Sequence, residues 1–186
     1  MAPIAPKEPY KLLNTQASIN AKKIRFELNQ IELPIGISET FGMIIHPGAA
    51  LAVPITNDEK VIILRQYRFA VSRRILEFPA GTLEDGESPL ESMKRELAEE
   101  AGYQANRWDH LGQMLPCPGY SDEVIHLYLA RDLIKLEEKP KGDDDEDLEV
   151  LSMTIEEFEN CLASRNELLD GKSITAWYQA RRLLKT

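Results

Sequence analysis

This chain of 186 residues has few cysteines, no excess of basic charge and no long apolar runs. Its two cysteines, Cys117 and Cys161, match no zinc-ligand spacing and cannot form a disulfide framework, which favours a cytoplasmic protein with reduced thiols. The formal net charge of −9 argues against the basic face that nucleic-acid binding requires. Since the sequence contains neither a signal-peptide pattern nor a window of about 18 apolar residues, we expect no membrane partner.

The composition is that of a folded protein, with 43% hydrophobic and 28% charged residues. The length predicts one domain with a short appended arm. Residues 1–18 have three prolines in the first nine positions and no apolar period, so they predict a mobile arm. Alternating apolar residues from Ile19 to Ile37 predict a strand. We therefore divide the chain into 1–42, an arm with strands, and 43–186, the main domain.

Strand and helix patterns are mixed along the main domain. Apolar runs bounded by turn residues predict strands at 41–48, 49–55, 60–67, 124–131 and 149–153. Helical patterns follow at 154–165 and 173–184. With a further helix after Ser88, this order predicts an α/β fold in which helices sandwich a mixed β-sheet.

The helix after Ser88 carries an unusual concentration of glutamate. Ser88 and Glu91 form a capping box, and Gly102 is placed to end the helix. Glu96 and Glu100 are one turn apart, where like charges cost about 0.2–0.5 kcal/mol per pair. The two carboxylates emerge side by side and can share a hard divalent cation, which would offset the repulsion. The alternative interpretation is a solvated, charged helix face.

The segment GTLEDGESPLESMKRELAEEAGY, residues 81–103, resembles the Nudix box, the signature of hydrolases that cleave nucleoside diphosphates linked to another group. The positions that match the signature are Gly81, Glu87, Arg95, Glu96, Glu99, Glu100 and Gly102, whereas Tyr103 replaces an aliphatic residue. The flanking segments LRQYRFAV (64–71), ILEFPAG (75–81) and PCPGYSDEVIHLYLA (116–130) resemble the ADP-ribose pyrophosphatase group. Pro118, fifteen residues after Tyr103, has the spacing associated with that group.

The resemblance implies the Nudix fold with an N-terminal β-strand extension, and hydrolysis of ADP-ribose to AMP and ribose 5-phosphate. It implies Mg²⁺ as the cofactor, with Mn²⁺ as a substitute, and two or three ions bridging the diphosphate. It also implies a homodimer formed through residues 1–42, with 43–186 as the catalytic domain. The alternatives are another substrate, such as GDP-mannose, a further nucleotide sugar, FAD or NADH, and a non-catalytic sensor of ADP-ribose or NAD metabolites.

The resemblance also assigns the metal site and its catalytic groups. The Ala80 carbonyl, Glu96 and Glu100 are the expected ligands, and Glu99 ligates or supports them. A loop pattern running from Gly142 to Val150 points to Glu146 as the general base or an additional ligand, although an acidic run of this kind is equally typical of a solvated loop. Structural roles in the box fall to Gly81, Glu87, Arg95 and Gly102, with Arg95 expected to orient Glu87 or Glu99 through ion pairs.

Substrate contacts are expected outside the box. Arg68 is a candidate for pairing with a phosphate through its planar fork, the alternative being an ion pair with a carboxylate at the surface. Glu77 either contacts the substrate or supports the loop that follows it. The ribose side is assigned to the loop residues Pro118, Gly119, Ser121 and Glu123. A turn-forming role explains Ser121 equally well, and Glu123 is a further candidate for approaching a metal.

Overall fold

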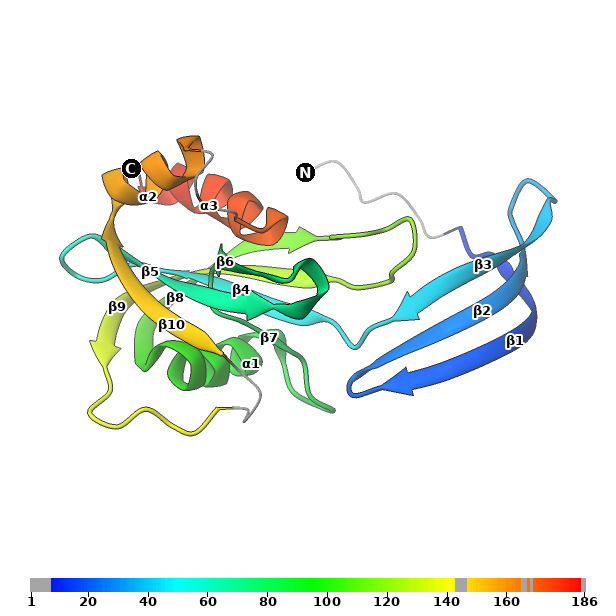
Figure 1. Cartoon of the computed structure of the whole chain (residues 1–186), viewed down its shortest axis with the longest axis horizontal. Helices are drawn as coiled ribbons and strands as arrows, with labels where there is room; N and C mark the ends of the chain where they lie inside the picture. Colours follow the sequence, from blue (N-terminus) through cyan, green and yellow to red (C-terminus); the bar gives the residue numbers. More distant parts are fainter. Residues whose placement is uncertain (1–7, 143–146, 165–166, 168, 185–186) are drawn as a thin grey trace. The chain divides into compact units, whose positions relative to one another are not determined.

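The structure is a computed structural model that describes residues 8–142, 147–164, 167 and 169–184. The described residues form two compact units (Figure 1). The first contains the chain up to Pro47 together with Cys117–Glu123, and the second contains the remainder. The sequence-based division between residues 42 and 43 stays a prediction. Within the described ranges, no helix is long and apolar enough to cross a membrane.

The first unit is built on a three-stranded antiparallel sheet in the order β1-β2-β3. Its strands are β1, Lys11–Ala21; β2, Ile24–Glu32; and β3, Ser38–Ile45. The prediction of an arm over residues 1–18 is therefore wrong from Lys11 onward. Every residue of β1 is exposed, so this strand has no buried face and leaves no apolar period in the sequence. Backbone pairing with β2, for example Ile19 opposite Phe26, defines it instead.

The second unit contains two sheets. The first is mixed, in the order β7-β4-β9-β8, because β4 and β9 run parallel while the other pairs are antiparallel. The second is antiparallel, in the order β10-β5-β6. The strand bounds are β4, Ala49–Pro54; β5, Lys60–Arg68; β6, Arg73–Glu77; β7, Ala80–Thr82; β8, Tyr103–Met114; β9, Ile125–Lys135; and β10, Leu148–Thr154. The sequence did not predict β8, whose residues are all half-buried or exposed.

Helices cover both faces of these sheets, as Figure 1 shows for α1 on one side and α2 with α3 on the other. Successive β4 side chains serve two separate cores, since Leu51 packs with α2 and α3 while Ala52 packs with α1. The helices are α1, Pro89–Glu96; α2, Ile155–Ala163; and α3, Gly171–Leu184. A 3₁₀ turn, η1, covers Phe69–Val71. The predicted α/β sandwich with a mixed sheet is confirmed.

The end of the glutamate-bearing helix differs from a regular α-helix. The capping box of Ser88 and Glu91 is present, with Pro89 in the first turn. After Glu96 the chain widens into a π-helical turn, η2, Leu97–Ala101, and Gly102 closes it with a left-handed backbone, φ 73°. Such turns occur frequently at functional sites. The turn lies within the segment that carries Glu99 and Glu100.

Candidate active site

The site begins where two buried glutamates meet the short strand β7. The Glu100 carboxylate accepts a hydrogen bond from the Ala80 N–H at 2.8 Å, and both Glu96 and Glu100 are buried. A Cβ atom added at Gly81 would lie 2.0 Å from the Glu96 Oε1 atom. Only glycine therefore leaves room for the Glu96 side chain in this position. The predicted pair of carboxylates is thus held against the Ala80–Gly81 backbone.

Arg95 binds three glutamates: Glu87 before the helix, Glu96 at its end and Glu99 in the π-helical turn. Its Nε and Nη2 atoms bind both oxygens of Glu87, at 3.0 and 3.1 Å. Its Nη1 atom lies 2.7 Å from Glu96 and 3.0 Å from Glu99. The hydrogen bond from Arg95 holds the pKa of the Glu87 carboxyl below its usual range, and the same contact raises the pKa of the arginine. The expected ion pairs of Arg95 with Glu87 and Glu99 are both present, with Glu96 as an additional partner.

The donor set fits a hard divalent cation. Three carboxylates share the single positive charge of Arg95, and the Glu100 carboxylate adds a fourth negative charge nearby on the same helix. Carboxylate and carbonyl oxygens are the ligands that Mg²⁺ prefers. In the described part of the chain, however, no three such side chains already form a closed metal-binding group. The Arg95 guanidinium lies between Glu96 and Glu99, so these two ligands would have to turn from the arginine to the ion.

A second charged cluster surrounds Glu77 at the end of β6. The Glu77 side chain is 2% exposed and binds Arg68 through both oxygens, at 2.5 and 2.9 Å. Lys172 binds the same carboxylate and also Asp170, the latter at 2.6 Å. Burial alone would raise the pKa of Glu77, but the hydrogen bonds and charges of Arg68 and Lys172 outweigh it and lower the pKa. The Glu77 carboxylate therefore stays ionised although it is buried.

The charge of Glu100, one of the two buried glutamates, acts on Arg68 in this cluster. Burial would lower the pKa of Arg68, yet the hydrogen bond and charge of Glu77, with a smaller contribution from the charge of Glu100, raise it. Arg68, predicted to bind phosphate, thus lies within electrostatic reach of Glu100 but is paired with Glu77. Its side chain is 42% exposed, so the guanidinium remains accessible from solvent.

The start of α3 is the part of the site that the sequence did not predict. Ser173 is buried, and its hydroxyl accepts a hydrogen bond from the Phe78 N–H at 2.8 Å. Two successive residues of α3, Lys172 and Ser173, therefore contact two successive residues, Glu77 and Phe78. Phe78 also packs against Trp177 of α3 with ring centroids 6.5 Å apart. No motif marks these contacts, because they join segments 95 residues apart in the chain.

The remaining predicted residues belong to the first unit or lie outside the described residues. Pro118, Gly119, Ser121 and Glu123 belong to the first unit, whereas the helix glutamates belong to the second. Ser121 accepts a hydrogen bond from the Glu123 N–H at 3.2 Å, as expected of a turn residue, and the Glu123 carboxylate lies 3.8 Å from the His46 Nε2 atom. Glu146, the expected general base, lies outside the described residues.

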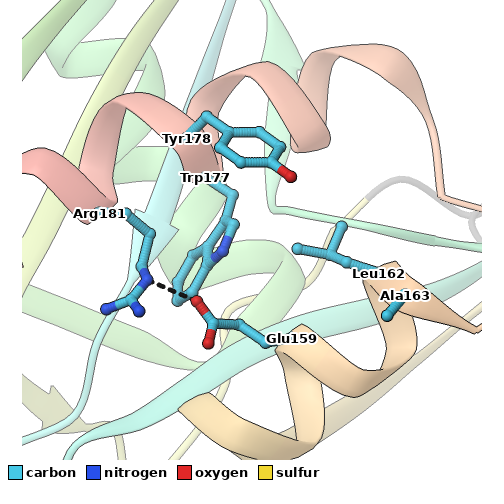
Figure 2. A pocket seen from close by; sticks show the side chains of 6 residues that line it. All are labelled: Glu159, Leu162, Ala163, Trp177, Tyr178 and Arg181. Carbon is cyan, nitrogen blue, oxygen red and sulfur yellow. Dashed lines mark ion pairs between the residues drawn. The ribbon is translucent and has the colours of Figure 1, made fainter.

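An open groove of about 270 Å³ lies between α2 and α3 (Figure 2). Arg181 is positioned over the Trp177 ring, 5.6 Å from its centroid, and forms an ion pair with Glu159 at 2.6 Å. The lining residues are Glu159, Leu162, Ala163, Trp177, Tyr178 and Arg181. None of the residues predicted to bind metal or substrate is among them, so the groove is distinct from the carboxylate site.

Comparison with known proteins gives concordant results. The family model described as the NUDIX domain matches residues 46–178. The chain is 36% identical over 166 residues to an ADP-ribose pyrophosphatase of Bacillus subtilis, covering 89% of each protein. It is 33% identical over 177 residues to a methanol dehydrogenase activator of Bacillus methanolicus, covering 94% of this chain and 95% of the activator. The crystal structure of an ADP compounds hydrolase has the same fold, with a TM-score of 0.79, 24% identity and coverage of 98% and 97%.

Proposed function

Because the chain belongs to the NUDIX domain family, we propose that it hydrolyses the diphosphate of ADP-ribose to AMP and ribose 5-phosphate with Mg²⁺ as cofactor. The observation that carries the proposal is the pair of buried carboxylates, Glu96 and Glu100, held against Ala80–Gly81. The similarity to an ADP-ribose pyrophosphatase over 89% of the chain supports the choice of substrate.

Each residue of the site has a separate role in this reaction. Glu96 and Glu100, with Glu99 and the Ala80 carbonyl, would hold the ions, which supply positive charge where the transition state becomes more negative. Arg95 orients Glu87 and the ligand side chains, and Arg68 is the cation for the substrate phosphates. Water adds to one phosphorus, and the bond from that phosphorus to the bridging oxygen breaks, giving two phosphate monoesters. Glu146 is assigned as the base that takes the proton of that water.

Turnover of a substrate panel tests this proposal. The purified protein with Mg²⁺ is expected to have its highest kcat/KM on ADP-ribose, about tenfold above the values for GDP-mannose, FAD and NADH. The ratio of kcat/KM values is the measure used, because it reports the discrimination between substrates directly. A chelator is expected to abolish the activity. A higher kcat/KM on another member of the panel would replace ADP-ribose as the substrate. Folded protein that turns over none of them would favour action on another enzyme, as the name of the B. methanolicus relative describes for that protein.

We also assign a homodimer formed through the first unit. Ile19, Phe26 and Ile44 are paired across β1, β2 and β3 and therefore share one face of that sheet. Ile19 is 64% and Phe26 is 45% exposed in the single chain. Apolar side chains gathered on one face are typical of an interaction surface. A second copy that contributes the same face would bury them in a symmetric contact.

Light scattering measures this assembly directly. The protein is expected to have roughly twice the 21.1 kDa mass of the chain. Phe26→Glu should shift it to a single chain, because a charge would be buried at the contact. Asn20→Glu is the control, since Asn20 is exposed and pairs with Arg25 on the opposite face of the sheet. A wild-type mass of one chain would contradict the assignment.

The cytoplasm is the proposed location. Cys117 and Cys161 are both free thiols, which supports a reducing compartment.

A further inference from the structure

Arg68 has two competing tasks in the proposed reaction. It forms a two-point hydrogen bond with Glu77, whose carboxylate is 98% shielded from solvent, and it is the cation assigned to the substrate diphosphate. Loss of its only cation leaves a buried carboxylate charged and uncompensated, which is strongly unfavourable. Arg68 can therefore turn to a substrate only if another positive charge remains on Glu77.

Lys172 is placed to supply that charge. Its Nζ atom binds the Glu77 Oε2 atom, and its side chain is 18% exposed. Asp170 also binds the ammonium, at 2.6 Å. The residue after Lys172, Ser173, accepts the Phe78 N–H through its hydroxyl and so anchors the start of the helix. Lys172 is therefore held in place independently of Arg68. The position of Glu77 is fixed even when one of its two cations moves.

We propose, on the basis of the function proposed above, that Lys172 is a positioning residue for substrate binding: it neutralises the buried Glu77 carboxylate so that Arg68 is available to the substrate diphosphate. Lys172 does not itself contact the substrate. Without it, Arg68 is the one described residue whose positive charge still acts on both Glu77 and Asp170. The arginine is then retained by the protein, and the substrate loses a charge-assisted contact.

The consequence is an effect on binding that a second substitution reverses. Lys172→Met is expected to raise the KM for ADP-ribose about tenfold with kcat little changed, because a contact common to the ground state and the transition state is weakened. Lys172→Met combined with Glu77→Gln should return KM to within about twofold of the wild type, because the carboxylate that retains Arg68 is gone. Lys172→Arg, which keeps the charge, should resemble the wild type.

The experiment measures binding and turnover on the same proteins. Calorimetry with a methylene-bridged analogue of ADP-ribose, which cannot be hydrolysed, gives Kd without chemistry, and kcat and KM are measured on ADP-ribose. Lys172→Gln is included because it keeps a hydrogen-bond donor but not the charge, and it decides the matter if Lys172→Met does not fold. Lys60→Met is the matched control, since it removes a lysine paired with an exposed carboxylate, Asp58, at 2.8 Å.

The outcomes separate this proposal from the proposed function. If the wild-type protein does not hydrolyse ADP-ribose, the function is wrong. If it does, weaker analogue binding by Lys172→Met or Lys172→Gln together with recovery in the double variant supports the role of Lys172. Wild-type affinity in the neutral variants overturns it. A double variant that binds as weakly as Lys172→Met also overturns it, since Lys172 would then act on the ligand or on the fold directly.

Discussion

Glu100→Gln is expected to lower kcat for ADP-ribose by about a thousandfold, because a carboxylate that holds a catalytic cation contributes several kcal/mol to the transition state. The substitution keeps the shape of the side chain and an oxygen that can accept the Ala80 N–H bond, which is 2.8 Å long. Removing one negative charge from a crowded group of carboxylates does not destabilise the fold. The melting temperature should therefore fall by no more than about 3 °C.

Steady-state kinetics with Mg²⁺ and a titration with Mn²⁺ test this prediction together. Metal affinity should fall along with kcat, whereas a loss of activity at unchanged affinity would assign Glu100 to a different role. Glu156→Gln is the matched control, because Glu156 is an exposed glutamate of α2 and the charge change is identical. Wild-type turnover by Glu100→Gln would refute the metal assignment and, with it, the proposed mechanism.

Gly81→Ala is expected to lower kcat/KM by about a hundredfold through the position of one side chain, since displacement of a catalytic group by about 1 Å has an effect of this size. The added methyl would lie 2.0 Å from the Oε1 atom of Glu96 and 2.2 Å from its Cγ atom. The glutamate side chain can rotate away, which preserves the fold but moves a ligand out of the site. Metal affinity is therefore expected to fall while the melting temperature changes little.

Gly171→Ala provides the comparison for this substitution. A Cβ atom at Gly171 has no heavy atom within 4 Å, so the same chemical change is made in open space. Kinetics and Mn²⁺ titration of the two variants, side by side, separate the steric effect from the loss of a glycine. Equal activities would mean that Glu96 adapts without leaving the site, and would contradict the close-approach argument for Gly81.

The helix that carries the glutamates was predictable because its information is local. Ser88, Glu91 and Gly102 mark its ends, and the spacing of Glu96 and Glu100 places both carboxylates on one side. The π-helical turn was not predicted, since its sequence, LAEEA, is compatible with a regular helix. Strand β1 was not predicted, because it pairs with β2 but has no buried face that would impose an apolar period on its sequence.

The contacts around Glu77 could not be predicted from the sequence. An arginine at position 68 was compatible with two roles, a phosphate contact or an ion pair, and the structure shows the ion pair with Glu77. Lys172 could not be predicted, because a lysine at the start of a helix is commonplace and its partner is 95 residues away. Contacts of this kind depend on the final packing of α3 against the sheet, which no local pattern encodes.

The attachment of α3 to the end of β6 has a consequence for the order of events during biosynthesis. A chain made from its N-terminus acquires Glu77 and the glutamate helix long before it acquires Lys172 and Ser173. Until α3 is made, Arg68 is the one described residue that pairs with the Glu77 carboxylate, and the Phe78 N–H lacks its acceptor. A nascent chain, or one shortened at its C-terminal end, would thus carry the entire glutamate motif but lack the α3 contacts that complete the site.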